Sequence, residues 1–366
     1  MRQLVLHVGS IKTGSTSAQT SFATQRDMLA AHGVHYGSFS RNHGAMSRII
    51  RATRRYGMPG QTATPPQRGR EANDFATILR AAEEAAAIES GTYFLSSEAL
   101  LTHSRRNVRL LKDIVDTLFP GFDVKILVYI RHPLAYTISR GQNMVKLRYD
   151  TTDDVEDHGY DGELRIGVER YASIFGRDAM IVRSYDAVVA AGRSVQQDML
   201  EAIGHPEAAK DLVVTRSNES VSMNAALIAD RVNRNLKAEG VEINANVRRA
   251  KKRLFSQIDG PRFAFSAAAL DDARPVCQAE ADWFAEAYGI DLTPPKVTAR
   301  ETIAEELMPE AEREEAGRRI VSQLKQAADP KPKRKRARKA AAAKQLRPRK
   351  RPSLFAKIIG RLNLAR

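Results

Sequence analysis

A lysine, two glycines and several hydroxyl side chains occur together in "HVGSIKTGST", residues 7–16. Gly9 and Gly14 have the spacing of the nucleotide-binding motif G-x-x-x-x-G-K-[ST], and two hydroxyl residues follow the second glycine. The motif places its lysine directly after the second glycine, whereas Lys12 lies between the glycines. A glycine loop between a strand and a helix binds anions through backbone N–H groups and the helix N-terminus. The stretch therefore predicts an anion-binding loop in which the lysine has a different task.

A second candidate site follows "DVKILVYIR", the most strand-like run in the chain, which ends at Arg131. Ser139 lies eight residues further on, in a stretch that reads as a helix with proline in its first turn. A guanidinium fork matches the geometry of a phosphate group well. The alternatives are a surface ion pair for Arg131 and a solvated or back-bonded hydroxyl for Ser139.

Strand-like and helix-like stretches alternate along most of the chain. We expect strands at residues 4–9, 34–39, 92–96, 123–131 and 179–188. We expect helices at residues 16–33, 73–91, 107–120, 132–146 and 194–204, and mostly helices from there to about residue 327. The polar stretches 57–70 and 150–163 read as loops. This alternation predicts an α/β fold of three layers, with a central parallel sheet flanked by helices.

Both candidate sites resemble motifs of the P-loop sulfotransferases. "HVGSIKTGSTSAQTSF" is similar to the loop that binds the 5′-phosphosulfate in that family, with Lys12 at the position of the family's lysine. "ILVYIRHPLAYTISRGQNMVK" is similar to the family's 3′-phosphate motif, in which Arg131 and Ser139 take the arginine and serine positions. "YFLSSEAL", "IVRSYDAV" and "RSNESVSMNAAL" look like bacterial members. The resemblance covers residues 4 to about 235, and its two main motifs lie about 120 residues apart.

The resemblance implies a P-loop sulfotransferase-like fold and the sulfonate donor 3′-phosphoadenosine 5′-phosphosulfate (PAPS). It also implies that the donor is bound by Lys12, Thr13, Gly14, Ser15, Thr16, Arg131 and Ser139. A transferring sulfonate carries less negative charge than a phosphoryl group, so no metal ion is expected as a clamp. Lys12 would instead neutralise the bridging oxygen as its bond to sulfur breaks.

Transfer to a hydroxyl or amine also needs a group that removes a proton from the acceptor. Glu98 follows the strand "YFLSS", at the sheet edge where ligands bind in open α/β folds. His43 lies in "RNHGAM", after the first helix, and a histidine titrates near neutral pH. Members of the resembled family use either residue type, and we rank Glu98 first. A helix-cap role for Glu98 and a loop role for His43 remain the alternatives.

Charge is distributed unevenly along the chain. Residues 331–366 hold 15 of the 58 lysines and arginines and no acid, which leaves 43 basic and 43 acidic residues elsewhere. The excess of +15 therefore belongs to a basic tail, and the rest of the chain is neutral and shows no basic-aromatic pattern for specific nucleic-acid binding. The single cysteine, Cys277, excludes an internal disulfide, and no histidine–cysteine spacing indicates a metal site.

These observations predict four regions. Residues 1–300 form the P-loop domain, 301–328 a charged helical extension, 329–352 a disordered basic linker, and 353–366 a short amphipathic helix. No leader peptide or stretch of roughly 20 apolar residues is apparent, so we expect a cytoplasmic protein. The last helix and its basic linker suit an anionic membrane surface, which would place the protein peripherally at the inner face of the membrane.

The function expected is transfer of a sulfonate group from PAPS to a hydroxyl or amine on a small molecule, lipid or glycan. One alternative is a P-loop kinase or NTPase, against which the displaced Lys12 and the lack of a clear magnesium-binding aspartate after a later strand both argue. Another is a non-catalytic protein that binds membrane or nucleic acid through its basic tail. Fold alone does not fix the acceptor.

Overall fold

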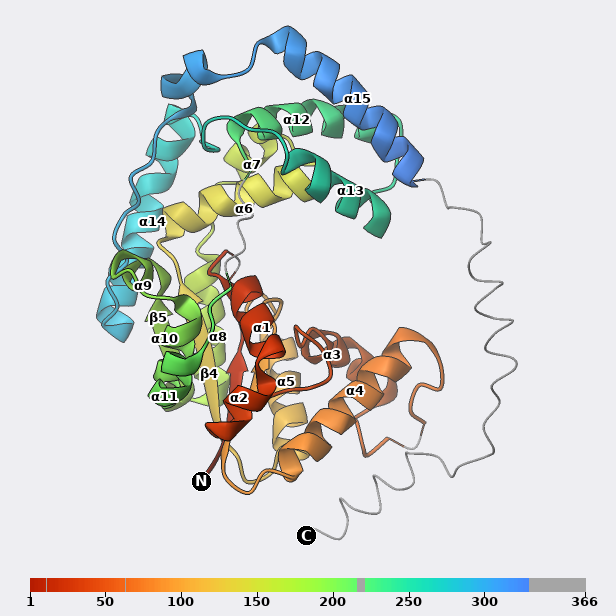
Figure 1. The fold of residues 1–366 in the computed structure, drawn as a ribbon, viewed down its shortest axis with the longest axis vertical. Coiled ribbons are helices and arrows are strands. Elements are labelled where there is room, and N and C mark those ends of the chain that lie inside the picture. The colour runs from red at the N-terminus through yellow and green to blue at the C-terminus, as the bar shows by residue number, and fades with distance from the viewer. Residues whose placement is uncertain (11, 63, 216–220, 329–366) are drawn as a thin grey trace.

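The protein is described by a computed structural model over residues 1–10, 12–62, 64–215 and 221–328. Its centre is one sheet of five parallel strands in the order β2-β3-β1-β4-β5. The strands are β1 (Arg2–His7), β2 (Val34–Tyr36), β3 (Gly91–Ser96), β4 (Asp123–Ile130) and β5 (Met180–Ser184). Helices cover both faces of the sheet (Figure 1), which confirms the expected α/β class and its central parallel sheet.

Apolar side chains point to both faces of the sheet along its central strands, which explains why helices cover both faces. Leu4 and Leu6 of β1 point into one apolar cluster and Val5 points into the other, because successive strand residues face opposite sides. The first cluster is completed by α3 (Ala45–Tyr56), α4 (Gly69–Ala86), α5 (Arg105–Leu118) and α8 (Glu163–Phe175). The second is completed by α1 (Ser15–Thr24), α2 (Arg26–Ala31), α9 (Tyr185–Ala190), α10 (Val195–Ala202) and α11 (Pro206–Asp211).

A third apolar cluster lies outside the sheet and is made almost wholly of helices, which we call the helical lobe. Its members are α6 (Pro133–Leu147), α7 (Thr152–His158), α12 (Met223–Ala238), α13 (Ala245–Phe255), α14 (Ala267–Tyr288) and α15 (Glu310–Ala328). Helix α6 follows β4 directly, so it connects the sheet edge to this lobe (Figure 1). Two short 3₁₀ turns complete the described chain, Arg177–Ala179 and Arg300–Glu306.

The charged stretch near the end of the described chain forms α15, which lies against α12 and α13. Ile320, Val321 and Leu324 of α15 are buried in the helical lobe, while most of its charged residues are exposed. The division of the chain at residues 300 and 328 remains a prediction. The expected linker 329–352 and amphipathic helix 353–366 lie outside the described residues.

Several local expectations were wrong. Residues 150–163 are not all loop, because Thr151 caps α7: its hydroxyl accepts from the Asp154 N–H at 3.0 Å, and the Asp154 carboxylate accepts from the Thr151 N–H at 2.8 Å. The expected helix at 16–33 is two helices that meet at Gln25, and α3 lies in a stretch where no element was expected. None of the described helices combines the length and apolar character needed to cross a membrane.

Candidate active site

The loop after β1 has an unusual backbone. Gly9, Lys12 and Gly14 have φ angles of 70°, 65° and 77°, in the left-handed region. Within the described ranges, Lys12 is the one non-glycine residue with a positive φ. That conformation costs a side-chain-bearing residue about 1–2 kcal/mol, and such strain is concentrated at functional sites. Left-handed residues in a loop turn successive N–H groups toward a common centre, which is the geometry of an anion site.

Two buried hydroxyl groups of this loop have no hydrogen-bond partner among the described residues. They belong to Ser10 and Ser15, each of which is 2% exposed. A buried polar group without a partner costs about 1–3 kcal/mol, so these hydroxyls fit an anion that accepts hydrogen bonds from them. The neighbouring Thr13 hydroxyl is already used, since it donates to the Ser10 carbonyl at 2.8 Å. Helix α1 begins at Ser15 without a side-chain cap, which leaves its positive end facing the same loop.

Glu98 is held against this loop from the β3 side. A Cβ atom on Gly9 would lie 2.6 Å from the Cα of Glu98 and 3.2 Å from its Cγ, so only glycine fits there. Backbone hydrogen bonds maintain the contact: the N–H of Ser97 donates to the His7 carbonyl at 2.9 Å, and the N–H of Leu101 donates to the Val8 carbonyl at 3.2 Å. Glu98 is half-buried at this position.

Arg131 lies on the other side of the loop, at the end of β4. The N–H of Val8 donates to the Leu127 carbonyl at 3.0 Å, so the residues after β1 and β4 leave the sheet side by side. The Nε atom of Arg131 lies 3.5 Å from the Oδ1 atom of Asp186 and has no hydrogen-bond partner in the described part of the chain. Its guanidinium stacks 5.6 Å from the centre of the Tyr185 ring.

Helix α9 links Arg131 to the loop. Its first residue, Tyr185, lies 3.8 Å from the place that a Cβ of Gly14 would occupy, and it also stacks on Arg131. Asp186 pairs with Arg131 and accepts the N–H of His132 at 2.6 Å. Sequence reasoning missed both roles because it extended the β5 strand to residue 188. The signal was Ser184, whose hydroxyl accepts from the Ala187 N–H at 3.1 Å and so starts the helix.

Ser139 lies further from the loop in sequence than Arg131 does. It is half-buried in α6, two helical turns beyond Arg131, and the structure shows no contact between the two among the described residues. Eight residues of α-helix span roughly 12 Å, so the two side chains would have to reach toward each other to bind one group. Thr16, in the first turn of α1, is half-buried beside the loop.

His43 is fully buried, and both of its ring nitrogens are bonded to the backbone. Its Nδ1 accepts from the Ser96 N–H at 2.8 Å, and its Nε2–H donates to the Gly37 carbonyl at 2.9 Å. Burial lowers the pKa of His43 to about 4. No ring nitrogen is left to accept a proton from a substrate, whereas Glu98 lies beside the loop; which of the two acts as a base stays a prediction. His43 instead fixes the end of β3, two residues before Glu98.

A buried cluster of polar side chains lies next to the loop. The Nδ1 of His7 lies 2.8 Å from the Ser96 hydroxyl, which also accepts from the Gln19 amide at 3.1 Å. Burial lowers the pKa of His7 to about 4, so this ring is neutral at neutral pH. The cluster joins β1, β3 and α1, the three elements that determine where the loop lies.

Comparison with known proteins gives a distant structural likeness. No protein-family model and no curated protein sequence matches the chain. A crystal structure of a sulfotransferase from Alicyclobacillus acidocaldarius is similar over 65% of this chain and 96% of that protein, with 17% identity and a TM-score of 0.34. At that level of similarity we draw no functional argument from it. Within the described residues, no group of three or more histidine, cysteine or acidic side chains is arranged to hold a metal ion.

Proposed function

We propose that the protein is a sulfotransferase that moves a sulfonate group from PAPS to a hydroxyl or amine acceptor. The observation that supports the proposal is the loop between β1 and α1, where Lys12 has a left-handed backbone and the buried Ser10 and Ser15 hydroxyls have no hydrogen-bond partner among the described residues. Arg131 lies one strand away and supplies a second cation for the donor's 3′-phosphate. The residues present therefore fit both phosphate-bearing ends of PAPS.

The order of the strands gives the proposed site a direction. Because β3, β1 and β4 are neighbours, Glu98, the loop and Arg131 follow one another along the carboxyl edge of the sheet. The nucleotide would lie on the Arg131 side. The acceptor would approach from the Glu98 side, opposite the leaving nucleotide, as an in-line displacement at sulfur requires.

In this proposal, each residue of the candidate site has a defined role in the transfer. Glu98 takes the proton from the acceptor hydroxyl as that oxygen forms a bond to sulfur. The bond between sulfur and the bridging oxygen breaks, and its electron pair stays on the 5′-phosphate of the nucleotide. Lys12 stabilises the negative charge that develops on that oxygen. The backbone and hydroxyls of residues 13–16 bind the 5′-phosphate in both states, while Arg131, aligned by Asp186 and assisted by Ser139, binds the 3′-phosphate.

A transfer assay distinguishes this proposal from a kinase or NTPase. The full chain is incubated with sulfur-labelled PAPS, or separately with γ-phosphate-labelled ATP and magnesium, and with a panel of phenols, alcohols, amines, lipids and glycans. Label appearing on an acceptor from PAPS, with none from ATP, supports the proposal. Transfer from ATP alone would assign a kinase, and ATP hydrolysis without transfer would assign an NTPase.

A further inference from the structure

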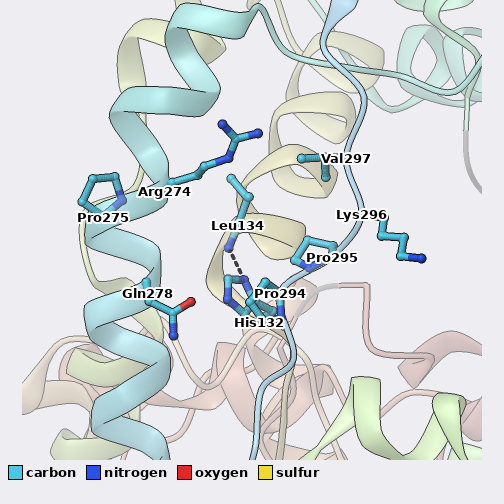
Figure 2. Close-up of a pocket in the computed structure, with 9 residues that line it drawn as sticks. All are labelled: His132, Leu134, Arg274, Pro275, Gln278, Pro294, Pro295, Lys296 and Val297. Carbon is cyan, nitrogen blue, oxygen red and sulfur yellow. Dashed lines mark hydrogen bonds between the residues drawn. The ribbon is translucent and has the colours of Figure 1, made fainter.

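A cavity of about 690 Å³ lies between three segments that are distant in sequence. These are the start of α6, the middle of α14 and the extended segment 294–297 (Figure 2). No role in the proposed transfer is assigned to this cavity. Its volume falls in the range of small-molecule sites, which are commonly found where different elements meet.

The base of the cavity contains a buried donor. His132 is 2% exposed, and its Nδ1 accepts from the Leu134 N–H at 3.2 Å. Burial lowers the pKa of His132 and outweighs the opposing influence of Asp186, Gln278 and Asp282. The ring is therefore neutral, and the bond to Leu134 assigns its hydrogen to Nε2.

The Nε2–H of His132 has no hydrogen-bond partner among the described residues. Gln278 faces the ring (Figure 2), and a hydrogen-bonding contact with its side chain opposes the lowering of the His132 pKa, but that contact falls outside ordinary hydrogen-bond geometry. The Gln278 amide N–H donates instead to the Asp282 carboxylate at 2.8 Å. A buried donor without a well-formed hydrogen bond costs free energy, and a better-placed acceptor from outside the chain would remove that cost.

The rim of the cavity is positively charged. Arg274 and Lys296 line it, and none of the described residues that line it is acidic. One guanidinium nitrogen of Arg274 pairs with the exposed carboxylate of Asp271 at 2.6 Å. Acidic and basic residues are equal in number outside residues 331–366. A cavity lined by two cations and by no carboxylate is therefore more positive than this part of the chain on average. That positive charge favours an anion.

The wall between base and rim is apolar. It is formed by Leu134, Val297 and the proline rings of Pro275, Pro294 and Pro295. Proline has no backbone N–H, so such a wall offers apolar contact and few donors. We propose that this cavity binds an organic anion with an apolar body. Arg274 and Lys296 hold its charged end, the prolines contact its body, and the Nε2–H of His132 donates to a neutral acceptor such as a carbonyl oxygen.

Three matched probes test the proposal on the full chain by titration calorimetry and saturation-transfer NMR. Monomethyl suberate has a carboxylate and a carbonyl at opposite ends, octanoate lacks the carbonyl, and dimethyl suberate lacks the charge. We expect monomethyl suberate to bind most tightly. Replacing both cations, Arg274→Gln with Lys296→Gln, should weaken its binding by about tenfold, since each exposed charge contributes modestly.

Two variants make the result specific. His132→Asn keeps a side chain that can cap α6 but removes the Nε2–H, so it should abolish the preference for monomethyl suberate over octanoate. Replacing two exposed cations outside the cavity, Lys210→Gln with Arg318→Gln, should leave binding unchanged. Equal binding of the charged and uncharged esters, unchanged affinity in the Arg274/Lys296 variant, or no binding of any probe at millimolar concentration would overturn the proposal.

Discussion

Gly9 and Glu98 lie so close together that a Cβ atom at Gly9 would come within 2.6 Å of the Glu98 Cα atom. This contact joins the proposed anion-binding loop to the candidate base, which follows a different strand. Because β1 and β3 are paired along their length from Arg2↔Gly91 to His7↔Ser96, the distance between loop and base is fixed by the sheet. The relationship explains how Lys12 and Glu98, which are 86 positions apart, could serve one site.

Substituting Gly9 tests that contact. Gly192 has a similar φ of 68°, but no atom lies within 4 Å of the place that its Cβ would occupy. Gly192→Ala should therefore lower the free energy of unfolding only by the cost of an alanine at positive φ, about 1–2 kcal/mol. Gly9→Ala should lose a further 1–3 kcal/mol or so, because the Glu98 backbone must move. Urea unfolding of both variants measures the difference. Equal losses would mean that the contact is not close.

Lys12→Ala should reduce turnover by about 10²–10³ while nucleotide affinity changes much less, because the lysine charge matters most as the leaving oxygen becomes negative. Turnover is measured as release of 3′-phosphoadenosine 5′-phosphate from PAPS with the best acceptor found, and affinity by calorimetry. Lys210→Ala, which changes an exposed cation, is the control. Near-normal turnover in Lys12→Ala would show that the loop lysine does not act on the reacting bond.

Glu98→Gln and His43→Gln should have different effects, the first mainly on activity and the second mainly on stability. Glu98→Gln keeps the size of the side chain and removes the base, so activity should fall by about 10²–10⁴ with the unfolding midpoint nearly unchanged. His43→Gln should mainly lower stability, because the Ser96 N–H and the Gly37 carbonyl lose their ring partners at a cost of about 1–3 kcal/mol each. Full activity in Glu98→Gln, or a normally stable but inactive His43→Gln, would reverse these assignments.

Stability should fall as the solution is acidified, through His7 and His43. Burial lowers the pKa of each to about 4 from an ordinary value of 6.5. The unfolded chain therefore binds protons between these values that the folded chain does not, so the stability present above pH 6.5 is lost as pH falls toward 4. The loss approaches about 3 kcal/mol for each histidine. Urea unfolding from about pH 7 to pH 4.5 measures it, and His43→Gln should make the dependence less steep.

The sheet and the loop were predictable from local sequence because their signals are local. Alternating strands and helices indicated the parallel sheet, and the Gly9–Gly14 spacing marked a loop that the structure places between β1 and α1. The bonding of His43 was not predictable, since its partners at Gly37 and Ser96 depend on tertiary packing. The roles of Tyr185 and Asp186 were hidden for the same reason, because only the folded sheet brings α9 against Arg131.

Helix α7 shows a different limit. The acidic composition of residues 150–163 favoured a loop, although Thr151 and Asp154 have the spacing of a capping box. Val155, between the acidic residues, is buried in the helical lobe and holds the helix in place. The prediction of a loop followed the acidic composition and overlooked the capping-box spacing, although both are visible in the sequence.

The most direct test of the proposed function is the contribution of the 3′-phosphate to binding. Titration calorimetry compares 3′-phosphoadenosine 5′-phosphate with adenosine 5′-monophosphate, both in the presence of a chelator, in the wild-type chain and in Arg131→Ala. We predict that the wild type binds the 3′-phosphorylated nucleotide more tightly by about 2–4 kcal/mol, and that Arg131→Ala loses most of this difference. Equal affinity of the wild-type chain for the two nucleotides would contradict the assignment of PAPS as the donor.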